Sequence, residues 1–125
     1  MKQRTITYLT DANLITCVIQ KDLAEPVLEA AKNAGAQGAT ISYAQGTGIR
    51  ERMGLLGVAV EVEREIVQVL VSKDQVDRIF ERMYLAGRLD TPGMGYIYAA
   101  PLVQAATYIP AHLLEDKDSL SSLGV

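Results

Sequence analysis

Two short glycine-bracketed segments are the parts of this sequence whose residue types could bind a ligand. The first is Gly-Thr-Gly at residues 46–48 and the second is Gly-Met-Gly at residues 93–95. Glycines let the main chain approach a ligand closely and turn N–H groups toward an anion. Arg50, Arg52 and Arg88 lie near these segments and would supply positive charge for a phosphate. The pattern indicates an anion site. An equally good interpretation is that these glycines only satisfy turn geometry.

Residues that commonly catalyse reactions are few and scattered. The chain has one histidine, His112, and one cysteine, Cys17, and it has no Ser-His-Asp or Cys-His set at a recognisable spacing. No cluster of cysteines and histidines has the spacing of a metal site. Carboxylates alternate with basic residues, as in residues 61–65, which is typical of a solvated charged surface. The sequence therefore favours a binding protein over an enzyme, and it predicts no required cofactor and no metal.

Length and composition narrow the class of protein. The 125 residues fit one domain with one modest core, and 49% apolar with 22% charged residues is ordinary for a globular protein. A formal net charge of −3 offers no basic surface for nucleic acid. The lone cysteine fits a reducing compartment, and no apolar run has the length of a signal peptide or a membrane span. We therefore expect a cytoplasmic, soluble protein that does not insert into a membrane.

The hydrophobic pattern predicts four strands and two helices. Runs rich in β-branched residues indicate strands over residues 14–19, 39–43, 58–71 and 96–99. Apolar residues three and four apart indicate one helix over residues 23–34 and a second that runs from a capping box at Ser72 and Gln75 to Gly87. Cys17 is then expected as a core residue of the first strand. The valines of the third strand change parity, which predicts a bend or bulge at residues 63–65.

This order of elements, βαββαβ, is that of the ferredoxin-like fold of the α+β class, a four-stranded antiparallel sheet with two helices on one face. Residues 66–71 are apolar at nearly every position, so apolar side chains also fall on the face that the helices leave uncovered. The expected cover is another subunit. We expect the domain over residues 14–110, an arm or extra strand over 1–13, and a polar, mobile tail over 111–125.

The connection between the second and third strands is longer than a hairpin requires. Hairpins usually turn in about 2–5 residues, whereas the glycines here bracket residues 46–57. Arg, Glu, Arg and Met occupy the centre of this segment. Such a loop is more typical of an element that contacts a partner than of a plain connection, with a flexible surface loop as the alternative.

Taken together, these features resemble the PII-like signalling proteins. The resemblance covers about residues 14–109 and is strongest at residues 35–40, 46–48, 65–77 and 92–98. It implies a homotrimer that binds an adenine nucleotide or small anion in clefts between subunits. The ligand would then switch the long loop and so control a partner such as a membrane transporter or an enzyme. The residues assigned to nucleotide binding are Thr40, Gly46, Thr47, Gly48, Arg88, Gly93, Met94 and Gly95. The residues assigned to the partner-binding loop are Ile49, Arg50, Glu51, Arg52 and Met53.

The sequence departs from the nitrogen-regulating members mainly in charge. Tyr96 stands where those members carry a phosphate-binding lysine, Thr107 and Ile109 stand where they carry arginines, and the long loop has no tyrosine to be modified. Each lost charge-assisted contact is worth about 1.5–3 kcal/mol. A less charged adenine nucleotide or another small anion is therefore expected. The alternative is a trimeric metal-responsive or structural module of the same fold, similar to the copper-tolerance proteins.

Overall fold

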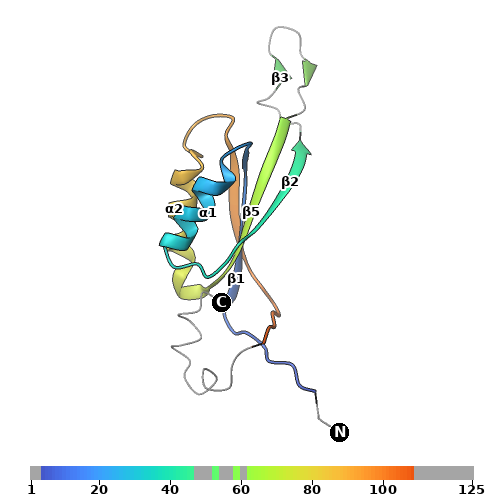
Figure 1. Ribbon diagram of the computed structural model, residues 1–125, viewed down its shortest axis with the longest axis vertical. Coiled ribbons are helices and arrows are strands. Elements are labelled where there is room, and N and C mark those ends of the chain that lie inside the picture. The colour runs from blue at the N-terminus through green and yellow to red at the C-terminus, as the bar shows by residue number, and fades with distance from the viewer. Residues whose placement is uncertain (1–3, 47–51, 54–57, 60–61, 109–125) are drawn as a thin grey trace.

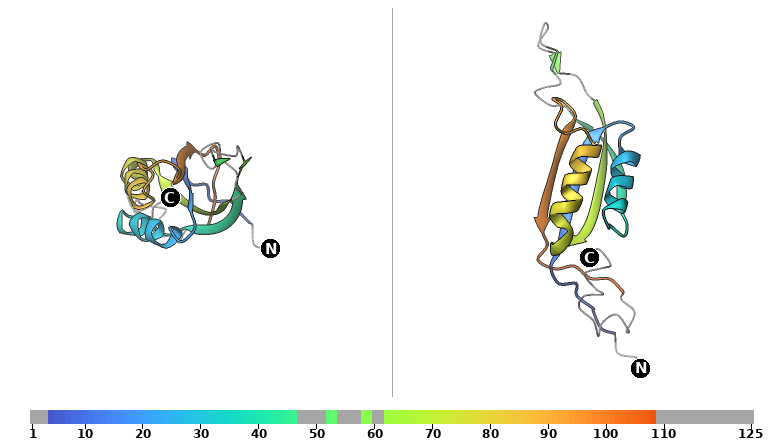
Figure 2. Two further views of the ribbon diagram at one scale, coloured as in Figure 1. Left: turned by 90° about the horizontal axis from the view of Figure 1, so that it is seen from above. Right: turned by 90° about the vertical axis from the view of Figure 1, so that its left-hand side faces the viewer.

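The computed structural model describes residues 4–46, 52–53, 58–59 and 62–108. Their main part is a four-stranded antiparallel sheet with two helices on one face (Figure 1). The sheet contains β1 (Ala12–Gln20), β2 (Thr40–Gly46), β5 (Val62–Ser72) and β6 (Gly95–Pro101) in the order β2-β5-β1-β6. The helices α1 (Ala24–Asn33) and α2 (Val76–Ala86) lie side by side, and the short 3-10 helix η2 (Lys73–Gln75) leads into α2 (Figure 2). The predicted ferredoxin-like fold is confirmed.

The core lies between the sheet and the helices. Six odd-numbered residues of β1 and β5 face the helices and are at most 1% exposed: Ile15, Cys17, Ile19, Val67, Val69 and Val71. Val27 and Ala31 of α1 and Ile79 and Met83 of α2 meet them and are fully buried. Burial raises the pKa of the Cys17 thiol to about 12, so the side chain is neutral and acts as a packing residue, as the sequence predicts.

The two helices begin in different ways. The predicted capping box precedes α2, where the Ser72 N–H donates to Gln75 Oε1 at 3.4 Å. No side chain at Leu23 caps α1; instead the Ala24 N–H donates to Oε1 of Glu65 on β5 at 2.9 Å. Glu65 is only 9% exposed. The sequence interpretation of this residue as part of a solvated surface was therefore wrong, because the start of α1 requires an acceptor that its own sequence lacks.

The predicted third strand is divided into two parts. β4 (Val58–Ala59) pairs with β3 (Arg52–Met53) in a separate ladder beyond the ends of β2 and β5 (Figure 1), and β5 begins at Val62. The predicted bulge at residues 63–65 was wrong, since the β2–β5 pairing continues without a break from Gly46–Val62 to Thr40–Gln68. Val58 belongs to a different ladder from the valines of β5, so its parity gives no information about the faces of β5.

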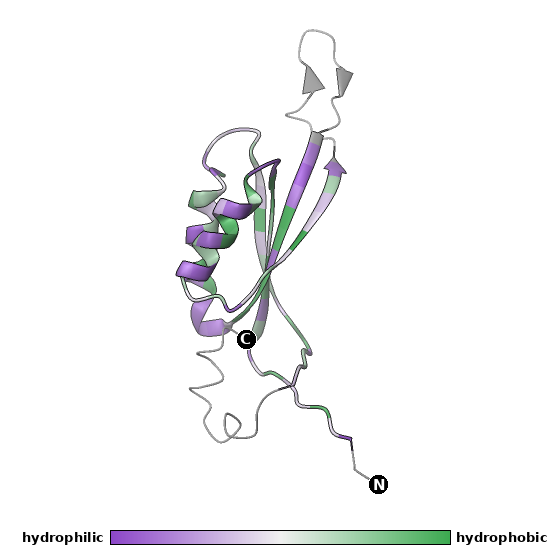
Figure 3. Cartoon of the chain, viewed as in Figure 1, coloured by the Kyte–Doolittle hydropathy of each residue, from purple (hydrophilic) through white to green (hydrophobic). Residues whose placement is uncertain are grey.

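The sheet face away from the helices carries apolar side chains that no described element covers. Leu14 and Val18 of β1 and Ile66 of β5 point to this face and are only partly exposed, whereas Leu70 of β5, on the same face, packs against Leu9 and Ala12. At the β6 edge of the same face the rings of Tyr96 and Tyr98 stack with centroids 6.3 Å apart, and they are 59% and 49% exposed. Hydrophobic segments lie along the strands of the sheet (Figure 3). We call this surface the open face.

At the end of the sheet far from the β3–β4 ladder, the chain before β1 lies beside the chain after β6. The Leu9 N–H donates to the Ala105 carbonyl oxygen at 2.7 Å, and Tyr8 forms an isolated bridge with Ala106. Leu9 and Ala12 form a small second core with neighbours from both segments. The N-terminal segment therefore packs against the domain, and residues 109–125 lie outside the described part of the chain.

Candidate ligand-binding site

The two glycine segments lie at the same end of the sheet but at opposite edges. Gly46 is the last residue of β2 and pairs with Val62, whereas Gly95 is the first residue of β6 and pairs with Ile19. β5 and β1 lie between these edges. Gly46 and Gly95 are three strand spacings apart across the sheet, about 14 Å, and the register also offsets them along the strands, since Gly46 is level with Val62 and Gly95 with Glu65. Within one chain, therefore, Gly46 and Gly95 lie apart.

Thr40 lies at the other end of β2. It is exposed and begins the strand, about 20 Å along the strand from Gly46. Its partner on β5 is Gln68, whose Nε2 donates to Thr16 Oγ1 at 3.3 Å on the open face. Thr16 is 3% exposed. Sequence reasoning missed Thr16 and Gln68, because only the β2–β5–β1 register places these polar groups beside Thr40.

Arg88 occupies an unusual backbone position at the end of α2. The Arg88 N–H donates to the Leu85 oxygen and the Leu89 N–H to the Tyr84 oxygen, both at 3.1 Å, which is the Schellman pattern of helix ends. Arg88 has a φ of 56°, the left-handed conformation that glycine usually supplies there. The helix ends at Gly87, as the sequence predicts, but Gly87 has a φ of −81° and the left-handed residue is Arg88, which follows it.

Hydrogen bonds hold the loop that follows Arg88. The Thr91 N–H donates to the Arg88 oxygen at 3.0 Å, and the Met94 N–H donates to the Thr91 oxygen at 3.4 Å. Nε2 of Gln20, at the end of β1, donates to the Gly93 oxygen at 3.2 Å. These contacts fix the second glycine segment against the end of β1.

Gly93 and Gly95 have different structural reasons to be glycine. Both have positive φ, 81° at Gly93 and 133° at Gly95. A Cβ at residue 93 would meet nothing within 4 Å, whereas a Cβ at residue 95 would overlap the Val18 carbonyl oxygen on β1. Packing against β1 therefore already accounts for glycine at position 95. A substitution there would test the fold rather than ligand binding.

The first glycine segment and the long loop are only partly described. Thr47, Gly48, Ile49, Arg50 and Glu51 lie outside the described residues. The backbone of Arg52 and Met53 forms β3 and pairs with Ala59 and Val58.

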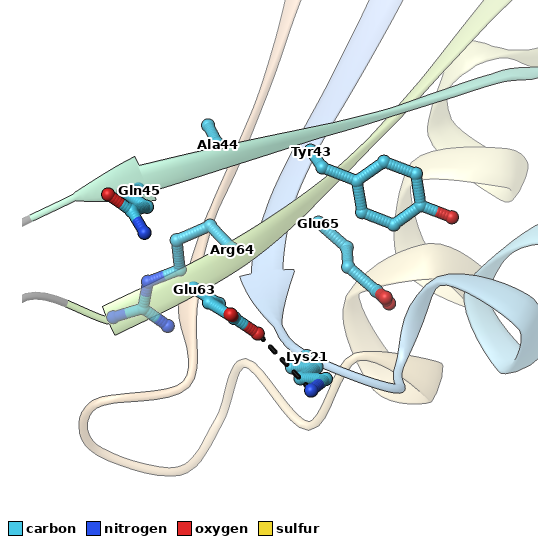
Figure 4. A pocket seen from close by; sticks show the side chains of 7 residues that line it. All are labelled: Lys21, Tyr43, Ala44, Gln45, Glu63, Arg64 and Glu65. Atoms are coloured by element: carbon cyan, nitrogen blue, oxygen red, sulfur yellow. Dashed lines mark ion pairs between the residues drawn. The ribbon is translucent and has the colours of Figure 1, made fainter.

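A surface cavity of about 540 Å³ lies where β2 ends and β5 begins (Figure 4). We call it the sheet-end cavity. Its lining residues are Lys21, Tyr43, Ala44, Gln45, Glu63, Arg64 and Glu65. Nζ of Lys21 lies 3.3 Å from Oε2 of Glu63, and the hydrogen bond with this carboxylate, together with its charge, raises the pKa of Lys21 above its usual value. The sequence analysis did not identify this cavity, because its residues come from three separate elements.

Comparison with known proteins identifies the family. The family model described as "Nitrogen regulatory protein P-II" matches residues 12–110, which is most of the chain. The chain belongs to the P-II family.

Two solved P-II structures share this fold. The Arabidopsis thaliana PII protein bound to citrate is 21% identical over 74% of this chain and 78% of its own, with a TM-score of 0.58. The B. subtilis GlnK–ATP complex is 21% identical over 73% of this chain and 81% of its own, with a TM-score of 0.60. The resemblance seen in the sequence is thereby confirmed.

Two further observations concern this P-II chain. Within its described residues, no group of three or more His, Cys, Asp or Glu side chains is placed to hold a metal ion. The helices of the described part are too short or too polar to span a bilayer.

Proposed function

We propose that this P-II protein is a homotrimeric regulator that binds an adenine nucleotide or another small anion in clefts between its subunits. The observation that carries the proposal is the placement of the two glycine segments at one end of the sheet and at opposite edges, Gly46 on β2 and Gly95 on β6. In a closed ring of identical copies, the β2 edge of one subunit faces the β6 edge of the next. Segment 46–48 of one copy would then meet segment 93–95 and Arg88 of its neighbour.

The open face supplies the reason for association. Its apolar residues on β1 and β5, interrupted by the hydrogen-bonded pair Thr16 and Gln68, lie beside the exposed rings of Tyr96 and Tyr98. Burial of such a surface stabilises by about 25 cal/mol per Å² of apolar area. A ring of three copies places these faces against one another, and it creates the clefts at the sheet edges at the same time.

The charge available in the cleft determines which ligand fits. Arg88 is the arginine nearest to the second glycine segment, and Tyr96 rather than a lysine follows that segment. The Met94 N–H of the segment already donates to the Thr91 oxygen, which leaves the Gly93 N–H and one guanidinium as candidate donors, and these suit a ligand of low negative charge. ATP and citrate, the ligands of the two solved relatives, are more highly charged anions. An adenine nucleotide with fewer phosphates is therefore our preferred ligand.

The regulatory output would come from the loop over residues 46–57. A ligand that contacts residues 46–48 acts on the base of this loop and favours one of its conformations. The loop would then change its affinity for a partner in the cytoplasm, with a membrane transporter or an enzyme as the candidates.

Calorimetric titration with ATP, ADP, AMP, cyclic AMP and cyclic di-AMP tests the binding step. We expect heat with at least one of them and a light-scattering mass of three chains of 13.6 kDa each. Arg88→Ala should weaken binding about tenfold or more, whereas Arg82→Ala, which removes an exposed arginine from α2, should leave it unchanged.

Two results would contradict the proposal. One is a well-folded single copy at micromolar concentration, because it would have no inter-subunit cleft. The other is the absence of heat with all five nucleotides up to about millimolar concentration, particularly if titration with a metal ion does release heat.

A further inference from the structure

We infer that the sheet-end cavity is a second binding site, which takes a guanidinium or ammonium group of an organic cation. This site goes beyond the proposed nucleotide cleft and does not depend on it, because its lining residues all come from one chain.

The cavity exists because the helices do not reach the end of the sheet. By strand alternation Tyr43 and Gln45 belong to the helix-facing side of β2, as does Ile41, which packs against the core. α1 begins at Ala24, however, and leaves Tyr43 75% exposed. An exposed aromatic ring that lines a cavity offers a flat apolar surface on which a cation can stack.

Glu65 supplies a carboxylate that is held in place before any ligand arrives. It pairs with Tyr43 across the two strands, so their side chains leave the sheet on the same side, as Figure 4 shows. One of its oxygens accepts the Ala24 N–H at 2.9 Å, which restrains the side chain, and the residue is 9% exposed. An aromatic ring beside a restrained carboxylate is an arrangement that favours a planar guanidinium.

Glu63 adds a second carboxylate at the rim. Its partner is Lys21, and the side chains of this pair are 62% and 63% exposed. Exposed ion pairs of this kind contribute little to stability, so an incoming cation can take the place of Lys21 at low cost. Glu63 can then accept hydrogen bonds from a ligand whose other side stacks on Tyr43.

The charges around the cavity favour a cation over an anion. Asp22 lies in the turn before α1, next to Lys21, and its charge acts on Lys21 together with those of Glu63 and Glu65. Against these three acidic groups stand Lys21 and Arg64. In Figure 4 the Arg64 guanidinium points away from Tyr43 and Glu65. The part of the cavity that Tyr43 and Glu65 line therefore has a negative potential.

The position of the cavity would let a bound ligand act on the long loop. It lies between the last residues of β2 and the first residues of β5, which are the two ends of the long loop. A cation bound there would contact both ends and would connect the loop to a second signal.

Nuclear magnetic resonance titration of the ¹⁵N-labelled protein tests this site. N-butylguanidinium should give saturable shifts of the amides of Ala24 and Tyr43, whereas the neutral isostere N-butylurea should not. The source of the cation is distinguished by comparing agmatine, a free small molecule, with a blocked Gly-Arg-Gly peptide, which presents an arginine side chain. The probe with the higher affinity indicates which source the site prefers.

Three variants and one control locate the site. Tyr43→Ala and Glu63→Gln should each weaken N-butylguanidinium binding at least tenfold. Glu65→Gln should do the same while its amide oxygen still accepts the Ala24 N–H. The control Glu29→Gln removes one charge from an exposed position of α1 outside the cavity and should change nothing. Equal binding of the urea, no saturation by N-butylguanidinium, or an equal effect of Glu29→Gln would overturn the inference. None of these results bears on the nucleotide titration.

Discussion

Substitutions of Arg88 distinguish the effect of its backbone conformation on the free energy of unfolding from the contribution of its side chain to ligand binding. Arg88 has a φ of 56° at the end of α2, whereas Gly35 occupies the corresponding position after α1. A side chain in the left-handed region costs about 1–2 kcal/mol, and glycine loses about 0.5–1 kcal/mol of additional chain entropy on folding. Arg88→Gly should therefore raise the free energy of unfolding by about 0.5–1 kcal/mol.

The assay compares Arg88→Gly with Arg88→Ala. Alanine removes the guanidinium but keeps a Cβ, so it retains the strained backbone. Both variants should lose affinity for the nucleotide or anion to a similar extent, and only the glycine variant should gain stability. The gain corresponds to a rise in melting temperature of about 2–5 °C for a chain of this size. Protein concentration must be fixed, because the stability of an oligomer depends on it.

Two results would refute this reasoning. If Arg88→Gly is no more stable than Arg88→Ala, the left-handed conformation carries no measurable strain. If Arg88→Gly binds the ligand as well as the unchanged protein does, the arginine is not retained at this strained position for ligand binding.

Two further predictions concern the packing of the sheet and of α1. Gly95→Ala should lower the free energy of unfolding, measured in urea, by at least about 3 kcal/mol, because the new Cβ would overlap the Val18 oxygen. The control Gly93→Ala should lower it by only about 1 kcal/mol. Equal losses of stability in the two variants would show that β1 can move aside. Glu65→Ala should cost about 2 kcal/mol, because it leaves the buried Ala24 N–H without its acceptor. Glu65→Gln should cost less than half as much, and a cost as large as that of Glu65→Ala would mean that the charge, rather than the hydrogen bond, stabilises the start of α1.

The sequence correctly predicted the features that are determined by residues close together in the chain. The capping box of Ser72 and Gln75 and the apolar stripe of α2 are local patterns. The same holds for Cys17, which lies within a run of β-branched residues and is fully buried. Composition alone also distinguishes the glycine segments as candidate sites, and their role in ligand binding stays a prediction.

The errors concern residues whose roles depend on distant partners. Glu65 was placed on a charged surface because its neighbours are charged, yet its acceptor role comes from Ala24, 41 positions away. The predicted bulge failed because a parity change cannot show that residues 58–59 pair in a ladder of their own.

The sequence alone thus determined the order of the elements, the core face of each helix and the two glycine segments, because hydrophobic period and turn chemistry act over short distances. The tertiary structure alone decided where these parts meet. It placed the glycine segments at opposite edges of the sheet, fixed Gln20 to Gly93 across 73 positions, and left Tyr43 exposed beside Glu65. These facts follow from strand order, register and the point at which α1 begins, and all three depend on contacts between residues far apart in the chain.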